Sequence, residues 1–469
     1  MSIKKKFFNF EKENSLFSIE INGIPIWERL RFGLFRKIEQ SNDKGQAHTS
    51  VDLSTTNQLT GAKLWLKNLF YRNPYLTKQS DFLFFGHPRR KKRPDGYWWD
   101  IYCDPIHEHG KLDSIHFERP YLLRHRTPAK TEIIRYIEFI IYSGTIQRKL
   151  GLRNVSFSYG EKKLLKNVED EIESIFDMRF DITGIVKRIL LNRKCRLWLY
   201  KKLLRKVDPR VAVILVSYGS KKKTFTEACK KEGIPVVELQ HGTIHPGHLG
   251  YTFPNGQPKT VFPDYLLTWG NFWKKNASFP IPDRRILPVG FPYIEMMSKK
   301  HKKVKSKKQI LFVSQGLIGK ALSQFALEVN KHRDIDHKLV YKLHPGEYDR
   351  WRDEYPQLVN ADIEVIDSSE PSLYHLFAES SIQIGIGSTA VYEGLAFGLE
   401  TFVYDYAGSE VLSSLIKANS AKLVTSSDEL AELIGQRADS FNRDSYFAPN
   451  ALEQVTLTLQ NLADKGTQD

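Results

Sequence analysis

The sequence has little cysteine and no long apolar run, and both absences narrow what the protein can be. The three cysteines among 469 residues, Cys103, Cys195 and Cys229, are too few and too scattered for a disulfide scaffold or a zinc cluster. No stretch approaches the roughly 18 apolar residues of a membrane-spanning helix. Charged residues follow Lys4–Lys6, where a signal peptide would need an apolar core. We therefore expect a cytoplasmic protein from a reducing compartment.

Acidic residues are scarce relative to basic ones, which predicts an anionic partner. The 70 Lys and Arg against 54 Asp and Glu give a net charge of +16. No RNA-recognition, zinc-finger or helix-turn-helix pattern is recognisable, so nucleic acid is not the expected partner. Basic residues cluster in Lys4–Lys6, Arg89–Arg93 and Lys299–Lys308. A lysine near an anionic leaflet contributes about 1 kcal/mol, so these clusters favour attachment to the inner face of the cytoplasmic membrane over nucleic-acid binding, with an ordinary solvated surface as the alternative.

Short β-branched runs alternate with helical stretches from Gln309 onward. The predicted strands are Gln309–Ser314, Lys338–Leu343, Asp362–Asp367, Ser381–Ile386, Thr401–Tyr404 and Lys422–Val424. Their continuous apolar character is typical of a buried parallel sheet with helices on both faces. We predict a doubly wound domain over residues 309–465.

The first half of the chain has the same character, although less regularly. The predicted strands are Asp81–Phe85, Val211–Val216, Val236–Gln240, Asp264–Thr268 and Ile286–Val289. Residues 131–206 are amphipathic without turn clusters and predict a helical insertion. The lysine-rich residues 299–308 predict a linker. The expected fold is therefore α/β, with two Rossmann-like domains, 1–300 and 309–465, facing a central cleft where such sheets bind ligands.

Two junctions of the second domain carry glycines or hydroxyls just before a helix. Gln315 and Gly316 follow the first strand, and Gly387, Ser388 and Thr389 follow the fourth. Glycines let backbone N–H groups approach a phosphate, and a helix N-terminus favours negative charge. Ser and Thr are also common helix caps. These residues predict an anion site, with plain turn and capping roles as the alternative.

A histidine and a carboxylate follow the second and third predicted strands of the second domain. His344 and Pro345 come after the second strand, where the imidazole could donate to a phosphate oxygen. Glu370 follows the third strand, where its carboxylate could accept two ribose hydroxyls. Each residue alone is more typical of an ordinary structural role. Together with the glycine and hydroxyl junctions they predict one nucleotide site.

A Gln240-His241-Gly242 element ends a strand of the first domain and would face that nucleotide site. The imidazole of His241 suits a general base toward an acceptor hydroxyl, and we place Gln240 in the catalytic centre beside it. His245 and His248 raise a metal hypothesis, but the glycines and proline between them prevent a helix that would align them. We predict no metal site and no cofactor.

These motifs resemble those of the two-domain GT-B glycosyltransferases, in particular bacterial sialyltransferases and Kdo transferases that use CMP-activated sugars. Those enzymes carry a His-Pro motif, a ribose-binding Glu and a Ser/Thr pair in the second domain. The resemblance covers residues 211–435 and implies His344, Ser388 and Thr389 at the donor phosphate, with Glu370 at the ribose. Where those sialyltransferases place an acidic pair before a glycine, this chain has Gln240-His241-Gly242.

His241-Gly242-Thr243 is more similar to the polyol-phosphate transferases of teichoic-acid and capsule synthesis, whose histidine acts as base. The leading hypothesis is a metal-independent glycosyltransferase that moves a sugar from a CMP-sugar to a surface-polysaccharide or lipid-linked glycan acceptor. The alternatives are a transferase that uses CDP-glycerol or CDP-ribitol, a UDP-sugar 2-epimerase and a non-catalytic binding protein. The epimerases need several acidic catalytic residues that we do not locate in the sequence.

Overall fold

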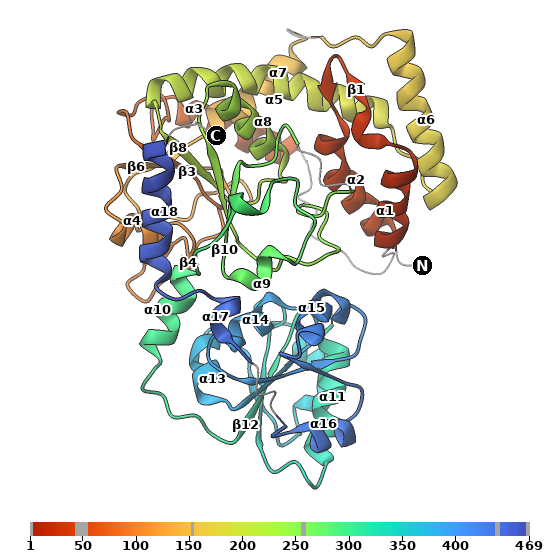
Figure 1. Cartoon of the computed structure of the whole chain (residues 1–469), viewed down its shortest axis with the longest axis vertical. Coiled ribbons are helices and arrows are strands. Elements are labelled where there is room, and N and C mark those ends of the chain that lie inside the picture. The colour runs from red at the N-terminus through yellow and green to blue at the C-terminus, as the bar shows by residue number, and fades with distance from the viewer. Residues whose placement is uncertain are drawn as a thin grey trace.

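The computed structural model describes residues 3–42, 55–151, 154–254, 259–316, 318–436 and 441–465. Two parallel sheets form the centres of two stacked α/β domains (Figure 1). None of the described helices is both long enough and apolar enough to cross a membrane.

The second sheet has six parallel strands in the order β14-β13-β12-β15-β16-β17. Its strands are β12 (Gln309–Val313), β13 (Lys338–Lys342), β14 (Glu364–Ile366), β15 (Ile382–Gly385), β16 (Glu400–Tyr404) and β17 (Lys422–Val424). Its longer helices are α11 (Gly319–Lys331), α13 (Leu373–Glu379), α14 (Thr389–Leu395), α15 (Ser413–Lys417) and α16 (Ser427–Leu433). The six predicted strands are confirmed. The order reverses between β12 and β15, as in a Rossmann fold.

Strand β12 shows why helices are needed on both faces of this sheet. Ile310 and Phe312 pack in one apolar core with α11 and α16, whereas Leu311 and Val313 pack in another core with α13, α14 and α15. Successive side chains of a strand point to opposite faces. A continuous apolar run therefore buries both sides only when each side is covered.

The first sheet has seven parallel strands in the order β11-β10-β9-β8-β3-β6-β7. They are β3 (Phe82–Phe85), β6 (Ser114–Glu118), β7 (Ile134–Tyr136), β8 (Val211–Ile214), β9 (Val236–Leu239), β10 (Tyr265–Thr268) and β11 (Ile286–Pro288). The order reverses between β3 and β8. Two Rossmann-like sheets confirm the predicted GT-B fold class.

Helices of the first domain include α4 (Asp104–His109), α5 (Glu138–Lys149), α6 (Tyr159–Phe176), α7 (Ile182–Val207), α8 (Ser220–Lys231) and α10 (Pro292–Lys300). Residues 131–206 are therefore mainly helical, but they are more than an insertion. They also supply the edge strand β7 and the helices α5 and α7, which cover one face of the sheet.

The last helix, α18 (Ala451–Lys465), lies on the first domain although the sequence assigned it to the second. Figure 1 shows it beside β8 and α4. Val455 and Leu459 pack in one apolar core with Phe84 and Val213 of the first sheet. The C-terminal segment therefore returns to the first domain, because apolar side chains on one face of the first sheet would otherwise be exposed to solvent. Its short neighbour α17 (Arg443–Tyr446) contacts α9 (Asn271–Lys274) at the junction of the domains.

The first eighty residues add a small lobe that sequence patterns did not resolve. It contains α1 (Ile3–Glu13), the hairpin β1 (Glu20–Ile21) and β2 (Ile24–Pro25), and α2 (Trp27–Asn42), followed by α3 (Thr55–Asn68). The lobe shares an apolar core with α6 and the start of α7. At its centre Arg31 is ion-paired with Glu11 at 2.6 Å, with both side chains buried.

Candidate active site between the two sheets

The strand order places the four predicted donor-binding junctions side by side. They follow β14, β13, β12 and β15, which are consecutive neighbours in the second sheet. The carboxyl ends of parallel strands meet at one edge of a sheet, and ligands bind there beside the reversal of strand order. In this sheet the reversal lies between Gly316, after β12, and Gly387, after β15.

Three of these loops touch one another. A Cβ atom added to Gly316 would lie 3.8 Å from His344 Nδ1, and one added to Gly387 would lie 3.9 Å from Gln315 Oε1. The Gly387 position would also meet the carbonyl oxygen of Gly408 at 2.6 Å, so only glycine fits there. The structure thus brings the predicted glycine loop, His344 and the start of the Ser388–Thr389 loop together.

His344 is exposed at the end of β13, with one ring nitrogen already committed. Its Nδ1 accepts a hydrogen bond from the backbone N–H of Gly346 at 3.1 Å. A neutral imidazole that accepts at Nδ1 carries its proton on Nε2. His344 therefore presents a donor N–H to solvent, as binding of a phosphate oxygen requires. Pro345 is exposed beside it.

Glu347, which the sequence analysis missed, holds these loops in place. Its buried carboxylate accepts hydrogen bonds from Ser314 Oγ at 3.0 Å and from Tyr355 OH at 2.8 Å through Oε1. Its Oε2 accepts from the backbone N–H of His344 at 2.7 Å. One carboxylate therefore ties the loop after β12 to the loop after β13. Its position three residues after His344, before a short turn, was the available sequence signal.

Glu370 stands apart from the other predicted donor-binding residues. It is exposed after the edge strand β14, and among the described residues its side chain forms no hydrogen bond with His344, Ser388 or Thr389. Its charge acts on Lys342 of β13. Burial lowers the pKa of Lys342 to about 8, and the charges of Glu370 and Asp367 oppose that shift.

His241 is the end of a hydrogen-bonded relay in the first domain. Tyr251 OH donates to the buried Glu238 Oε1 at 2.8 Å, so its oxygen is left to accept from His241 Nδ1 at 3.3 Å. This arrangement puts the imidazole proton on Nδ1 and leaves the lone pair on Nε2. Tyr218 OH lies 3.0 Å from that Nε2. Glu238, Tyr251 and Tyr218 thus orient His241 as a proton acceptor.

Burial keeps this histidine neutral. Desolvation lowers the pKa of His241 to about 3, and the positive charges of His248, His87 and Lys222 add to the effect. Desolvation likewise raises the pKa of Glu238. A neutral imidazole, whose Nε2 here accepts from Tyr218 OH at 3.0 Å, is the form that can take a proton.

Gln240, which the sequence predicts in the catalytic centre, is held by backbone groups of two loops. The residue is buried, and both ends of its amide are bonded to the chain. Its Nε2 donates to Gly242 O at 2.9 Å, and its Oε1 accepts from the backbone N–H of Trp269 at 2.8 Å. These bonds fix the loop that carries His241.

The loops of the two predicted half-sites contact each other across the domains. Thr243 Oγ1, two residues after His241, lies 2.8 Å from Thr389 Oγ1 of the second domain. Ser388 caps α14 by accepting from the N–H of Ala390 at 3.2 Å. The loop of the base and the loop of the hydroxyl pair are therefore adjacent, although 146 residues separate the two threonines.

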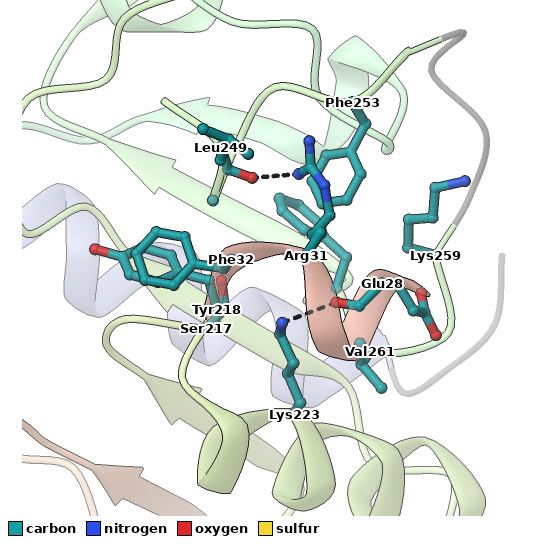
Figure 2. Close-up of a pocket in the computed structure, with 12 residues that line it drawn as sticks. Glu28, Arg31, Phe32, Ser217, Tyr218, Lys223, Leu249, Phe253, Lys259 and Val261 are labelled. Carbon is teal, nitrogen blue, oxygen red and sulfur yellow. Dashed lines mark hydrogen bonds between the residues drawn. The ribbon is translucent and has the colours of Figure 1, made fainter. Parts of the chain in front are cut away.

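The N-terminal lobe supports the same loop from the other side. Phe32 of α2 packs on Tyr218 with ring centroids 4.4 Å apart. A small pocket lies at this seam, lined by α2 and by residues within 249–254 and 259–262 (Figure 2). Two of its cations are already hydrogen-bonded, because Arg31 donates to Leu249 O and Lys223 donates to Glu28 O. The lobe thus fixes Tyr218 beside His241.

Over the residues that the structure describes, no group of three or more His, Cys, Asp or Glu side chains is arranged to hold a metal ion.

Neither a family model nor a curated protein matches the chain. Among solved structures it is similar to the UDP-GlcNAc 2-epimerase from Neisseria meningitidis bound to UDP-GlcNAc, at 14% identity over 81% of this chain and 100% of that chain, with a TM-score of 0.46. It is similar to the putative UDP-N-acetylglucosamine 2-epimerase from Listeria monocytogenes, at 10% identity over 83% of this chain and 98% of that chain, with a TM-score of 0.48. It is also similar to the wall teichoic acid polymerase TagF, at 11% identity over 88% of this chain and 99% of that chain, with a TM-score of 0.43.

Proposed function

We propose that this protein is a glycosyltransferase that moves a sugar from a nucleotide-sugar, of the CMP-activated type, to a hydroxyl of a glycan or lipid-linked acceptor. The observation that carries the proposal is the contact of Thr243 with Thr389. This contact brings the loop of His241, which is oriented to accept a proton, next to the carboxyl ends of the strands of the second sheet. The loops at that edge suit a nucleotide.

In the proposed reaction the acceptor oxygen forms a bond to the anomeric carbon while the bond from that carbon to the phosphate oxygen breaks. The bonding electron pair leaves with the nucleotide phosphate, and the acceptor's proton passes to Nε2 of His241. The Nε2–H of His344 and the hydroxyls of Ser388 and Thr389 stabilise the charge on the departing phosphate. The exposed Glu370 would reach the ribose from the edge strand.

Transfer of a polyol phosphate from a CDP-polyol is the second candidate. His241-Gly242-Thr243 favours it through the resemblance noted above, and the same base would serve. The bond that breaks is then the P–O–P link of the donor.

Nucleotide titration tests the donor assignment. Calorimetry with CMP, CDP and UDP should show binding of a cytidine nucleotide, and His344→Ala should weaken it about tenfold, because a charge-assisted hydrogen bond contributes about 1.5–3 kcal/mol. The matched control is His332→Ala, since His332 pairs with Asp428 beyond the end of α11 and should leave affinity unchanged. Tight UDP binding without cytidine binding would replace the proposal with UDP-sugar chemistry, the 2-epimerase included.

The lysine-rich segment 299–308 supports a further proposal, that the protein attaches to an anionic membrane surface. Lys299, Lys307 and Lys308 are ion-paired with acidic residues. Lys302, Lys303 and Lys305 are exposed, without an acidic partner in the described part of the chain. The Arg89–Arg93 cluster presents fewer charges to solvent than its sequence indicates, because Arg90 is buried.

Flotation with vesicles of anionic phospholipid should retain the protein and release it in high salt. Replacing Lys302, Lys303 and Lys305 with glutamine should reduce binding about a hundredfold, at roughly 1 kcal/mol per lysine. Neutral vesicles serve as the control. Equal retention of the triple variant would assign attachment to another surface.

A further inference from the structure

Five basic side chains gather where the strand order of the first sheet reverses. His87 and Arg89 follow β3, Arg119 follows β6, and Lys221 and Lys222 open α8 after β8. Strands β6, β3 and β8 are direct neighbours, so these residues share one edge of the sheet. It is the position at which a doubly wound sheet binds ligands, on the side opposite the proposed donor site.

The charges of these residues act on one another. Burial lowers the pKa of His87 to about 3, with further contributions from Lys222, Arg119 and Arg89. Burial lowers the pKa of Lys221 to about 7, and the charges of Arg119 and Arg196 add to the shift. Such mutual influence needs proximity, which agrees with the adjacency of the strands.

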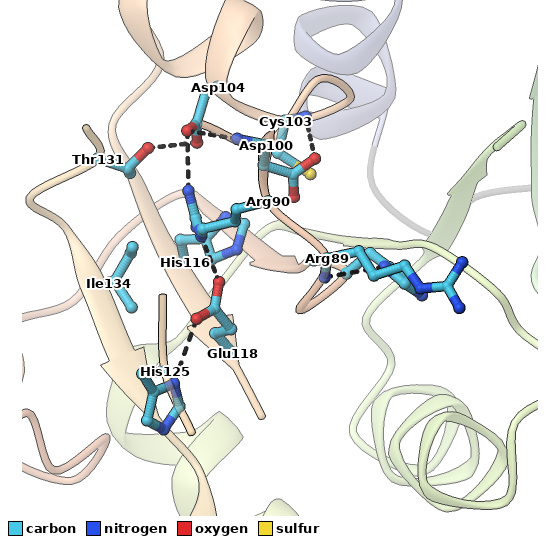
Figure 3. A network of polar contacts seen from close by, with 12 residues as sticks. Arg89, Arg90, Asp100, Cys103, Asp104, His116, Glu118, His125, Thr131 and Ile134 are labelled. Carbon is cyan, nitrogen blue, oxygen red and sulfur yellow. Dashed lines mark hydrogen bonds and ion pairs between the residues drawn. The ribbon is translucent and has the colours of Figure 1, made fainter. Parts of the chain in front are cut away.

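The neighbouring Arg90 has a structural role, and acidic side chains compensate its charge. Its guanidinium is enclosed by carboxylates, 2.9 Å from Asp104 Oδ2 and 2.6 Å from Glu118 Oε2. Figure 3 shows this network, and it shows Arg89 directed away from it. Lys222 Nζ is used as well, since it donates to the carbonyl oxygens of Phe85 and Gly86.

Arg89, Arg119 and Lys221 have no such compensation. In the ranges that the structure describes, none of the three forms an ion pair with an acidic side chain. Arg119 and Lys221 are also partly withdrawn from solvent. Cations in such positions are normally paired, so this cluster is arranged for an anion from outside the chain.

The cluster lies next to the proposed base. His87 and Lys222 are close enough to His241 for their charges to lower its pKa. We propose that Arg89, Arg119 and Lys221 bind a phosphate-type group of the acceptor and so hold the acceptor hydroxyl near His241. That the occupant is the acceptor rests on the proposed function; that an anion binds at this edge rests on the cluster itself.

The test uses inorganic pyrophosphate as a probe, in calorimetry on the full chain with CDP present at saturation. Wild-type protein should bind pyrophosphate in addition to CDP. Arg119→Gln with Lys221→Met should weaken pyrophosphate binding at least a hundredfold and change CDP affinity less than twofold. Arg89→Gln, an exposed position that does not threaten folding, should weaken it about tenfold. The matched control is Lys231→Met with Arg284→Gln, two exposed cations elsewhere on the first domain.

Unchanged pyrophosphate affinity in Arg89→Gln and in the double variant would overturn the proposal, as would displacement of pyrophosphate by CDP one for one. Failure of CMP, CDP and UDP to bind would refute the donor assignment alone. Pyrophosphate affinity would still test whether Arg89, Arg119 and Lys221 bind an anion.

Proton uptake gives a second readout. An anion beside Lys221 favours its charged form, and its pKa of about 7 leaves it mostly neutral at pH 8. Pyrophosphate binding at pH 8 should therefore take up close to one more proton in the wild type than in Lys221→Met, measured from the dependence of the binding enthalpy on the buffer. Equal proton exchange in the two proteins would remove Lys221 from the site.

Discussion

Replacement of His241 by asparagine should lower transfer at least a hundredfold while nucleotide affinity stays within twofold. General base catalysis contributes typically 10²–10⁴-fold, and asparagine cannot accept a proton at the position of Nε2. Donor binding should survive because His344, Ser388 and Thr389 belong to the other sheet. The measurements are kcat/KM for transfer and the Kd of the cytidine nucleotide.

Two further variants separate catalysis from packing. Tyr251→Phe removes the hydroxyl that links His241 to Glu238 and should cost about tenfold in kcat. His248→Asn changes a ring that packs on Tyr251 at 4.8 Å outside the relay, and should keep activity within a few fold. Unimpaired turnover in His241→Asn would remove the residue from the mechanism.

The pH profile gives an independent check on His241. A base must be unprotonated to act, so activity is lost as pH falls through its pKa. Because burial lowers that pKa to about 3, the acid limb due to His241 should lie well below pH 6.5. An acid limb centred at 6.5 that disappears in His241→Asn would contradict the buried, neutral state.

Replacement of Glu347 by alanine should lower the free energy of unfolding by roughly 3 kcal/mol or more. The change leaves Ser314 Oγ, Tyr355 OH and the N–H of His344 without their acceptor, and each buried unsatisfied group costs about 1–3 kcal/mol. Because the same carboxylate ties two loops of the nucleotide site together, cytidine-nucleotide affinity should fall at least tenfold. Urea unfolding and calorimetry measure the two effects.

Two other substitutions make this result specific. Glu354→Ala breaks an ion pair with Arg350 in the same segment, and such exposed pairs contribute at most about 1 kcal/mol, so stability should scarcely change. Glu347→Gln keeps the shape and one acceptor oxygen and should recover most of the stability. A Glu347→Ala protein as stable as Glu354→Ala would show that the loops hold together without this carboxylate.

The sheets could be predicted from the sequence because their strands are continuous apolar runs, and β12 shows such a run buried on both faces. The strands of the first domain were harder to predict. Strand β6 contains the buried polar residues His116 and Glu118, which break the apolar pattern. Strand β7 has only three residues and precedes a helix. The place of α18 could not be read from pattern, since an amphipathic helix does not specify which sheet its apolar face will cover.

The candidate site divides in the same way. Local motifs located His241, His344 and the Ser388–Thr389 pair, because each follows a strand that the pattern predicts. Tyr218 and Tyr251 carry no local signal, since their role comes from contacts with His241 that only the fold creates. Gln240 is predicted in the catalytic centre because it adjoins His241, and only the fold shows that its amide also bonds the backbone of Gly242 and Trp269.

The return of α18 to the first domain affects how the protein is made. Domains generally fold as units during synthesis, the N-terminal one first. Here the domain that leaves the ribosome first lacks the helix that supplies Val455 and Leu459 to its core until residues 451–465 are translated. The second domain, whose sheet strands all lie within residues 309–424, can close earlier. Of the two domains, the one whose synthesis begins first is thus completed after the other.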